Sequence, residues 1–518
     1  MRTRAFILLS VFIIFAMLAP MGCRTRGSNA FVIALGDNVR TIDPIGAPAV
    51  EAASERVRSL MFNTLVKKDE KFDYVGELAS DIKRSDDGLS FTFTLRDGVK
   101  FHDGRALTSA DVKYTLDLVF TSNFGKSASF YEGTGDQKRS LIKSVEAPDQ
   151  RTVVVTMIRP WVGLLSNLVP IAIIPKDSYE SQKEHPLGSG PFKFVRYDNA
   201  QQVCDVEAFP EYWDGPSKLQ HVRVRVISDM NALQAELQSG RVDIAPLPTS
   251  LSSDAVKRLE QDPNLQVRVF PGSNLALLTL NTASPPMDNV KVRQAIAYAI
   301  DRQNLIQNLL LGYGKIAHSI IPEESWAYSP GQTYSYDPAT ARRLLSESGV
   351  RFSKPIVFKL SGSSVAGRQY AGVIQNQLKE VGIPVEIQTP EANTFLDELR
   401  RGNFQFGYST WVGGNQDPIF YKDLFATSEI PTQTRTSRNR SRYSNPELDK
   451  LLDEAVNTFD RQRGRELYTK IQEIVSRDVP VIPLWYLSNI VIARKTVGNI
   501  QVNASGDWGF VKNLTVSQ

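Results

Sequence analysis

The sequence predicts an exported α/β protein of several domains, and three features of the chain point to this class. Strand-like and helix-like segments alternate between residues 355 and 411, as in parallel strands joined by crossover helices. An apolar run, Ala5–Ala19, follows Arg2 and Arg4, which is the order of a secretory signal. Without residues 1–22 the chain keeps about 500 residues, enough for roughly three domains of ~150 residues each.

The apolar run ends in a sequence that resembles a bacterial lipoprotein processing site. Gly22 precedes Cys23, so we expect residues 1–22 to be removed as a signal peptide and Cys23 to carry the lipid anchor. Pro20 is a departure, because such sites usually carry Leu three residues before the cysteine. An uncleaved N-terminal anchor is the alternative, since Ala5–Gly22 approaches the length of a membrane span. Both interpretations place the body outside the cytoplasm, on the periplasmic side or at the cell surface.

The charge of the chain argues against nucleic acid as a partner. The formal net charge of +4 includes Arg2 and Arg4, so the body is close to neutral. One basic stretch lies among Thr, Ser and Asn residues and predicts a solvated loop. Its members are Arg435, Arg438, Arg440 and Arg442.

Cysteine and histidine usage predicts neither a disulfide framework nor a metal site. Cys204 has no partner once Cys23 carries lipid, and its strand-like surroundings predict a buried free thiol. The histidines lie far apart without paired ligand spacing, so we expect no metal and no cofactor. They are His102, His185, His221 and His318.

The first third of the chain predicts strands and capped helices in turn. Phe31–Leu35 is an apolar strand, Asn38–Pro44 the loop after it, and Glu51–Leu65 a helix. Phe91–Leu95 alternates apolar and polar residues as a strand does, and a hairpin-type turn with a short return strand follows it. Two further segments read as helices. They begin at Thr108, where Asp111 completes a capping box, and at Pro175-Lys176.

Three runs of sequence carry a family resemblance. Residues 98–116, GVKFHDGRALTSADVKYTL, resemble the signature of the family 5 extracellular solute-binding proteins, the peptide and oligopeptide receptors of ABC importers. Residues 187–194, LGSGPFKF, resemble the point where the chain of that family crosses between domains. Residues 292–302, VRQAIAYAIDR, resemble a later block of helix. In this setting we expect His102 to be a structural residue of its turn.

The resemblance implies an α/β, two-lobed periplasmic-binding-protein-like fold of class II, cluster C type, with an extra domain. Domain I is then discontinuous, domain II is the extra domain, and domain III is the second lobe. The implied ranges are 28–61, 187–272 and 484–518 for domain I, 62–186 for domain II and 273–483 for domain III.

The resemblance also implies a function. It implies a monomeric receptor, not an enzyme, that captures a peptide or oligopeptide between closing lobes and delivers it to ABC permease subunits in the membrane. A non-peptide solute, such as a blocked peptide or an oligosaccharide, and a sensing role remain alternatives.

An exported serine hydrolase is the rival class. Gly362, Ser364 and Ala366 lie one residue from a nucleophile elbow, and Ser140 and Lys143 match Ser-x-x-Lys. The loop around Ser364 is expected to be too long for a strained elbow, and the scattered histidines offer no positioned base. We therefore expect no enzymatic activity.

The second half of the chain predicts an α/β domain. Asp337-Pro338 begins a helix and Gly349 ends it. Pro355–Leu360 and Pro384–Gln388 read as strands on either side of a helix at Arg368–Val381. A last pair of helices is expected from Asn445-Pro446 to about Arg477, followed by the strand VIPLWYL.

The stretch Asn403–Pro418, NFQFGYSTWVGGNQDP, carries the candidate binding site. It begins as a strand and passes an aromatic residue into a turn with two glycines, amides and a carboxylate, which suits a small-molecule site at a strand end. A surface turn explains the same residues, and these residues alone leave both interpretations open. With the family resemblance, we expect the ligand-binding residues to be Tyr408, Trp411, Gly413, Gly414, Asn415, Asp417, Ser361, Ser363 and Asn38.

Two departures from the family concern the ends of a bound peptide. Members that bind free peptides commonly carry Asp three residues after this Trp, where this chain has Gly414. Some dipeptide binders carry Arg in the loop that is 361–364 here, and Arg368 comes only later. A desolvated ammonium without a counter-charge is costly, so these departures weaken the case for a free dipeptide. Asp417 is either a replacement by a shifted loop or a structural Asp-Pro turn.

Overall fold

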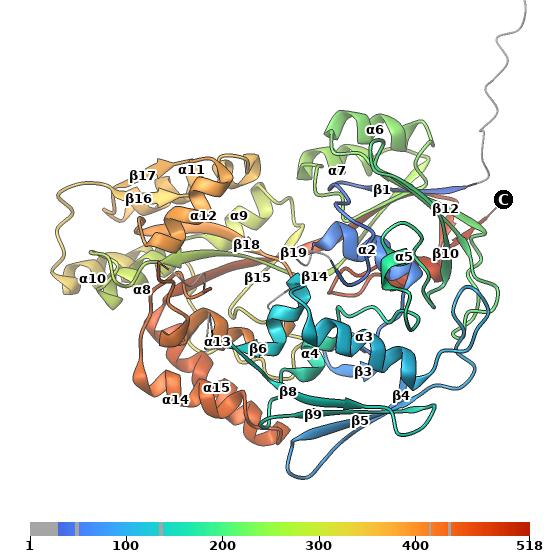
Figure 1. The fold of residues 1–518 in the computed structure, drawn as a ribbon. Helices are drawn as coiled ribbons and strands as arrows, with labels where there is room; N and C mark the ends of the chain where they lie inside the picture. The colour runs from blue at the N-terminus through green and yellow to red at the C-terminus, as the bar shows by residue number, and fades with distance from the viewer. Residues whose placement is uncertain (1–29, 47–50, 134–137, 414–415, 434–436, 518) are drawn as a thin grey trace, which may run out of the picture.

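One large sheet runs through both lobes of the computed structural model (Figure 1). The structure describes residues 30–46, 51–133, 138–413, 416–433 and 437–517. In spatial order its strands are β10 (Phe192–Asp198), β11 (Val203–Ala208), β12 (His221–Val226), β1 (Phe31–Leu35), β13 (Ile244–Pro246), β19 (Val481–Arg494), β14 (Leu265–Leu280), β18 (Phe406–Trp411), β16 (Ile356–Lys359) and β17 (Val385–Gln388), with β15 (Gly314–Ile316) beside β19.

The first lobe is built on β1, which lies parallel to β12 and β13. Its helices are α2 (Ala52–Met61), α6 (Met230–Gln238) and α7 (Ser253–Leu259). The C-terminal chain adds the 3-10 helix η5 (Gly509–Asn513) and the short pair β20 (Val497–Gly498) and β21 (Thr515–Val516).

The extra domain of the first lobe is an antiparallel sheet in the order β4–β5–β9–β8 with helices against it. The buried face of β5 carries Phe91, Phe93 and Leu95, as the alternation predicts. Its elements are β2 (Val66–Lys68), β3 (Tyr74–Gly76), β4 (Ala79–Arg84), β5 (Ser90–Leu95), α3 (Ser109–Thr121), η1 (Gly125–Phe130), β6 (Tyr131–Glu132), β7 (Arg139–Ser140), β8 (Ile142–Glu146), β9 (Thr152–Met157), α4 (Leu164–Leu168) and α5 (Tyr179–Gln182).

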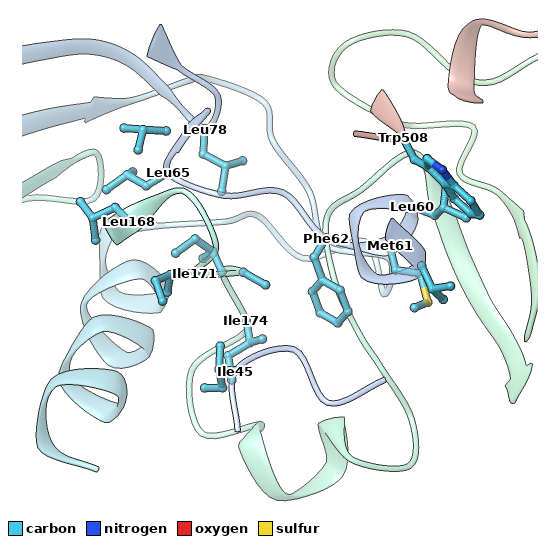
Figure 2. Packing of buried hydrophobic residues seen from close by; sticks show 14 of the residues in the cluster. Ile45, Leu60, Met61, Phe62, Leu65, Leu78, Leu168, Ile171, Ile174 and Trp508 are labelled. Atoms are coloured by element: carbon cyan, nitrogen blue, oxygen red, sulfur yellow. The ribbon is translucent and has the colours of Figure 1, made fainter. Parts of the chain in front are cut away.

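The extra domain shares one hydrophobic core with the α/β part of the first lobe. Figure 2 shows the junction, where Phe62 lies between Met61 and Trp508 on one side and the extra-domain side chains Leu65 and Ile171 on the other. Because the cluster is continuous, we expect these two parts to move as one body. The predicted domain boundaries remain a prediction.

The second lobe has its own core clusters. β16 lies parallel to β17 and β18, as expected for strands joined by crossover helices. Its helices are α8 (Val290–Ala299), α9 (Arg302–Asn308), α10 (Pro338–Ser348), α11 (Val365–Glu380), α12 (Ala392–Arg401), α13 (Phe420–Phe425), η4 (Thr427–Glu429), α14 (Pro446–Ala455) and α15 (Arg461–Asp478).

Helix ends follow local capping chemistry. The capping box of Thr108 and Asp111 forms at the start of α3, and Asp337 accepts two backbone N–H groups at the start of α10. Gly349 ends α10 with φ +67°, a left-handed conformation that glycine adopts without strain.

The structure differs from the predicted elements in several places. Residues 99–101 do not return along β5, whose neighbours are β4 and β9. The helix expected at Pro175 is only the short α5, and α11 begins at Val365 because Ser364 caps it. Helix α12 was not predicted from the sequence.

Two residues singled out in the sequence have structural roles. His102 is buried, donates from Nε2 to Gly190 O (3.0 Å) and accepts from Gly188 N (3.4 Å), and burial lowers its pKa to about 4. Cys204 lies buried in β11 as a free thiol, and burial raises its pKa to about 12. Both match their predicted roles.

None of the helices in the described part of the chain has the length and apolar character to cross a bilayer. The predicted signal peptide and Cys23 lie outside the described residues.

Candidate ligand-binding site between the lobes

The long strands β14 and β19 run through both lobes, and we call them the hinge strands. On either side of them, the neighbouring strands point their carboxyl ends toward the middle of this pair. β13 runs along β19 from Ala493 toward Val491, and its neighbour β1 is parallel to it. β18 runs along β14 from Leu280 toward Leu275, in the opposite direction. Ligands of open α/β sheets bind at carboxyl edges, so the two edges face one shared site.

The spacing of the two edges along β19 suits an extended ligand. Pro246 at the end of β13 pairs with Val491 of β19. Trp411 at the end of β18 pairs with Leu275 of β14, which in turn pairs with Tyr486 of β19. Five strand residues at ~3.4 Å each separate these positions by about 17 Å.

Trp411 forms part of the second-lobe wall. Its ring is partly exposed and meets Phe420 of α13 edge-on at 4.9 Å. Gly413 follows with φ +76°, so the chain turns there in a conformation that suits glycine. Gly414 and Asn415 lie outside the described residues. The strand reaches Trp411 itself, whereas the sequence placed this residue in the turn.

Tyr408 does not share the face of Trp411. Successive side chains of a strand point to opposite faces, and the two residues are three positions apart. Tyr408 is 7% exposed and packs in the core beside Tyr370 of α11, with ring centroids 5.9 Å apart. This corrects the sequence interpretation, in which both rings lined one site.

Ser361 and Ser363 follow the carboxyl end of β16, on the same edge as Trp411. Their hydroxyls bond to each other at 2.8 Å, and Gly362 N donates to Pro390 O (2.8 Å). No hydrogen bond joins either serine to Trp411 within the described ranges. The hydroxyl of Ser364 accepts from Gly367 N (3.1 Å), which is a helix cap and not a nucleophile elbow.

The first-lobe wall is formed by the loops after β1 and β13. Asn38 is exposed there, and Thr249 Oγ1 donates to the neighbouring Asp37 Oδ2 (3.4 Å). A Cβ at Gly36 would lie 2.6 Å from Thr249 Oγ1, so glycine permits this close approach. Burial lowers the pKa of Arg56, opposed by the charges of Asp37 and Asp507.

Asp417 is engaged by protein groups on both carboxylate oxygens. Oδ1 accepts Ile419 N at 2.8 Å in the turn that starts α13, and Oδ2 accepts the hydroxyl of Tyr74 from the extra domain. Burial and the nearby charge of Asp417 raise the pKa of Tyr74 well above its usual value. The geometry is that of a structural Asp-Pro turn which also joins the lobes.

Gln416 connects three parts of the molecule. Its Oε1 accepts from Lys68 Nζ of the extra domain (3.2 Å), and its Nε2 donates to Ser273 Oγ of the hinge strand β14 (2.9 Å). Ser273 N in turn donates to Ala504 O (3.0 Å) of the first lobe. Burial lowers the pKa of Lys68, opposed by Asp417. The loop after β18 is therefore tied to the hinge and to the opposite lobe.

A second contact joins the extra domain to the turn between α14 and α15. The ring of Phe459 lies 6.1 Å from Phe91, and the guanidinium of Arg84 lies over it at 4.4 Å. Arg461 pairs with Asp73 at 2.6 Å. The extra domain thus contacts both Gln416 and Asp417 of the loop after β18 and the turn between α14 and α15.

The basic loop predicted to be solvated is in part buried. Asn439 is fully buried, and its amide donates to Ala426 O (3.0 Å) and Tyr443 O (2.8 Å). Arg438 pairs with Asp423 (2.6 Å), and the guanidinium of Arg440 lies over the ring of Trp411. Arg435 lies outside the described residues. The prediction of a solvated loop was wrong for Arg440.

Two cavities lie within the second lobe, away from the hinge-facing edges. One of about 30 Å³ is lined by Arg302, His318 and Gln472 among others, a volume for water only. The other, about 580 Å³, is an open hollow beside Asp288 and Arg351. Neither includes a predicted ligand-binding residue.

Two lobes joined by two long strands, with facing carboxyl edges, define the class of two-lobed solute-binding proteins. A family model described as "Bacterial extracellular solute-binding proteins, family 5 Middle" matches residues 73–432. The chain belongs to family 5 of the bacterial extracellular solute-binding proteins. The family and fold predicted from the sequence are confirmed.

Three known proteins illustrate the similarity. Glutathione-binding protein GsiB of Salmonella typhimurium is 30% identical over 493 residues, 92% of this chain and 91% of the relative. Heme-binding protein A of Haemophilus influenzae is 28% identical over 507 residues, 90% and 88% of the two chains. The ABC transporter substrate-binding protein CtaP from Listeria monocytogenes has a TM-score of 0.83 at 24% identity, covering 94% of this chain and 99% of that one. The family comprises solute-binding proteins of ABC importers and not catalysts.

Sequence reasoning missed residues whose roles depend on distant contacts. Tyr74 donates to Asp417, which is 343 positions away in the sequence. Arg440, in the basic loop, contacts the ring of Trp411. Thr249 was not singled out because the end of β13 carries no motif. For Arg440 the basic composition of its loop was a signal of function, but the sequence does not indicate that Trp411 is its neighbour in space.

Proposed function

We propose that this protein is the extracytoplasmic substrate-binding protein of an ABC importer and captures a peptide or oligopeptide between its lobes. The facing carboxyl edges at the hinge carry this proposal. An extended chain about 17 Å long spans the two edges and can bind through main-chain hydrogen bonds, as an added strand does. The relative GsiB is named for glutathione, which is itself a small peptide.

The proposed ligand contacts are Trp411 with its glycine-rich turn on the second lobe and Asn38 on the first. Gly414 and Asn415 follow Gly413 in the sequence, and Ser361 and Ser363 follow the neighbouring strand β16; we include all four among the proposed contacts. Tyr408 supports the strand from the core side. Asp417 holds the lobes together, so a ligand ammonium at this point competes with Tyr74.

Mass spectrometry of compounds released from the purified protein by mild denaturation tests the proposal. Peptides in the released fraction, together with ligand-induced changes in tryptophan emission and melting temperature, support it. Flat responses across a broad oligopeptide library overturn it. Trp411→Leu is expected to weaken binding, while Trp213→Leu, which alters a tryptophan that donates to Asn63 within the first lobe, leaves affinity unchanged.

A non-peptide solute or a peptide with a blocked amino end is the second candidate. Gly414 and the engaged Asp417 favour it, because they leave no free carboxylate in the described part of the turn to pair with an ammonium. Uptake of labelled peptide by cells with and without the protein separates transport from sensing.

We further propose a monomeric, non-enzymatic lipoprotein anchored through Cys23. Labelling with a fatty-acid analogue that disappears in Cys23→Ala supports lipidation. An intact N-terminus in the mature protein supports the uncleaved anchor instead. Light scattering at the mass of one chain supports the monomer.

A further inference from the structure

Arg438 and Arg440 lie two positions apart but meet different partners. The buried side chain of Asn439 fixes the loop between them through bonds to Ala426 O and Tyr443 O. Arg438 forms an ion pair with Asp423 at 2.6 Å. The guanidinium of Arg440 lies 5.7 Å from the centroid of the Trp411 ring, at the carboxyl edge that faces the first lobe.

Arg440 carries a positive charge without a carboxylate partner. Among the residues that the structure describes, its side chain makes no ion pair and no hydrogen bond, only the contact with Trp411. The neighbouring segments 414–415 and 434–436, outside the described ranges, contain no Asp or Glu. Burial lowers the pKa of Arg440, and the charge of Arg438 adds to this effect. A guanidinium still stays protonated at neutral pH, so the charge remains.

Two acidic groups near this wall already have protein partners. Asp423 is paired with Arg438, and Asp417 accepts from Tyr74 and Ile419 N. A partly desolvated guanidinium without a carboxylate partner is suited to receive a planar anion, since it binds a carboxylate through two parallel N–H bonds. The contact with the ring of Trp411 places those donors beside the end of β18.

We infer that Arg440 receives a carboxylate group of the ligand beside Trp411, so that the site selects carboxylate-bearing, net anionic peptides or solutes. This inference rests on the proposed function and names the ligand chemistry of the same site. The second lobe then recognises its ligand through an acid group and not through an amine.

Matched probe pairs test the inference with the full mature chain. Trialanine is compared with trialanine amide, and glutathione with glutathione ethyl ester, by calorimetric titration. We expect each carboxylate probe that binds to bind about tenfold or more tightly than its blocked partner. We expect no such difference in Arg440→Gln and a smaller difference in Arg440→Lys, which keeps the charge. Arg438→Gln is the matched control and should show the same difference as the wild type. Equal affinities within every pair, or a difference that survives in Arg440→Gln, overturn the inference.

The ligand-free protein supplies a second readout. Arg440→Gln removes an unpaired charge, so its melting temperature should equal or exceed that of the wild type. Arg438→Gln breaks a pair and should lower it. A melting temperature that falls in Arg440→Gln while the probe difference persists identifies a structural arginine and overturns the inference.

Failure of the proposed peptide function gives a different pattern. If neither the probes nor a broad oligopeptide library binds the wild type, peptide capture is rejected, and the inference on Arg440 is tested with the compound that co-purifies. An anionic compound whose affinity falls in Arg440→Gln supports the inference. A neutral or cationic compound overturns it.

Discussion

Phe459 is a residue at which closure of the lobes can be perturbed without touching the ligand. It lies in the turn between α14 and α15 of the second lobe, and its ring contacts Phe91 and Arg84 of the extra domain. These contacts join the two lobes, so they are lost when the lobes separate. Phe459→Ala therefore destabilises the closed state relative to the open one, whereas ligand contacts stay unchanged.

The expected size follows from the contacts of the ring. Full burial of a Phe side chain contributes ~1.5–3 kcal/mol, and Phe459 is only partly buried, so its burial contributes about half. The aromatic pair and the guanidinium add about 0.5–1 kcal/mol. A total near 2 kcal/mol shifts closure about 30-fold. If the free protein is mainly open, Kd rises by the same factor, chiefly through faster dissociation.

Tryptophan emission and stopped-flow mixing with a peptide that binds the wild type measure this change. Phe124→Ala is the matched control, because Phe124 is also partly buried and pairs with one ring, Tyr179 at 5.3 Å, but within the first lobe. It should lower the melting temperature and leave Kd unchanged. Equal Kd values for Phe459→Ala and the wild type, or equal losses in both variants, refute the reasoning.

Tyr74→Phe removes the hydroxyl that donates to Asp417 across the lobes, so ligand affinity should fall about tenfold in calorimetric titration. Unchanged affinity contradicts this role. Burial lowers the pKa of His102 from 6.5 to about 4, so on acidification the unfolded chain takes up the proton first. Stability that is present above pH 6.5 is then lost toward pH 4, by about 3 kcal/mol. The urea midpoint of His102→Gln should fall less across that window, and parallel curves would exclude the effect. Burial raises the pKa of the Cys204 thiol to about 12, so a folded chain lacking Cys23 should resist a thiol reagent at pH 8 until urea unfolds it. Rapid labelling of the folded chain would disprove this.

Local chemistry made the ends of two helices predictable. The capping box at Thr108 and the pair of Asp337 and Gly349 specify where α3 and α10 begin or end, because the groups that satisfy a helix terminus lie within a few residues of it. The extent of β18 was less predictable. Pairing with β14 carries the strand to Trp411, and that partner is far away in sequence.

The same limit explains the errors at the candidate site. The period of a strand places Tyr408 and Trp411 on opposite faces, but only if the strand continues between them, and that depends on β14. The partner of Asp417 is Tyr74, 343 residues away, and nothing near either residue announces the contact. For Arg440 the sequence supplied the charge but not its place over Trp411.

In the proposed site, closure and ligand choice would draw on different charged groups, and this separation would favour anionic ligands. Asp417 is the carboxylate nearest the turn in sequence, and its bond to Tyr74 forms between the lobes. A ligand ammonium that reached Asp417 would compete with this bond and so oppose closure. A ligand carboxylate near Arg440 would neutralise an unpaired charge and leave the Tyr74 bond intact. The replacement of an acid by Gly414 therefore fits a receptor that closes most readily on a ligand held by its acid group.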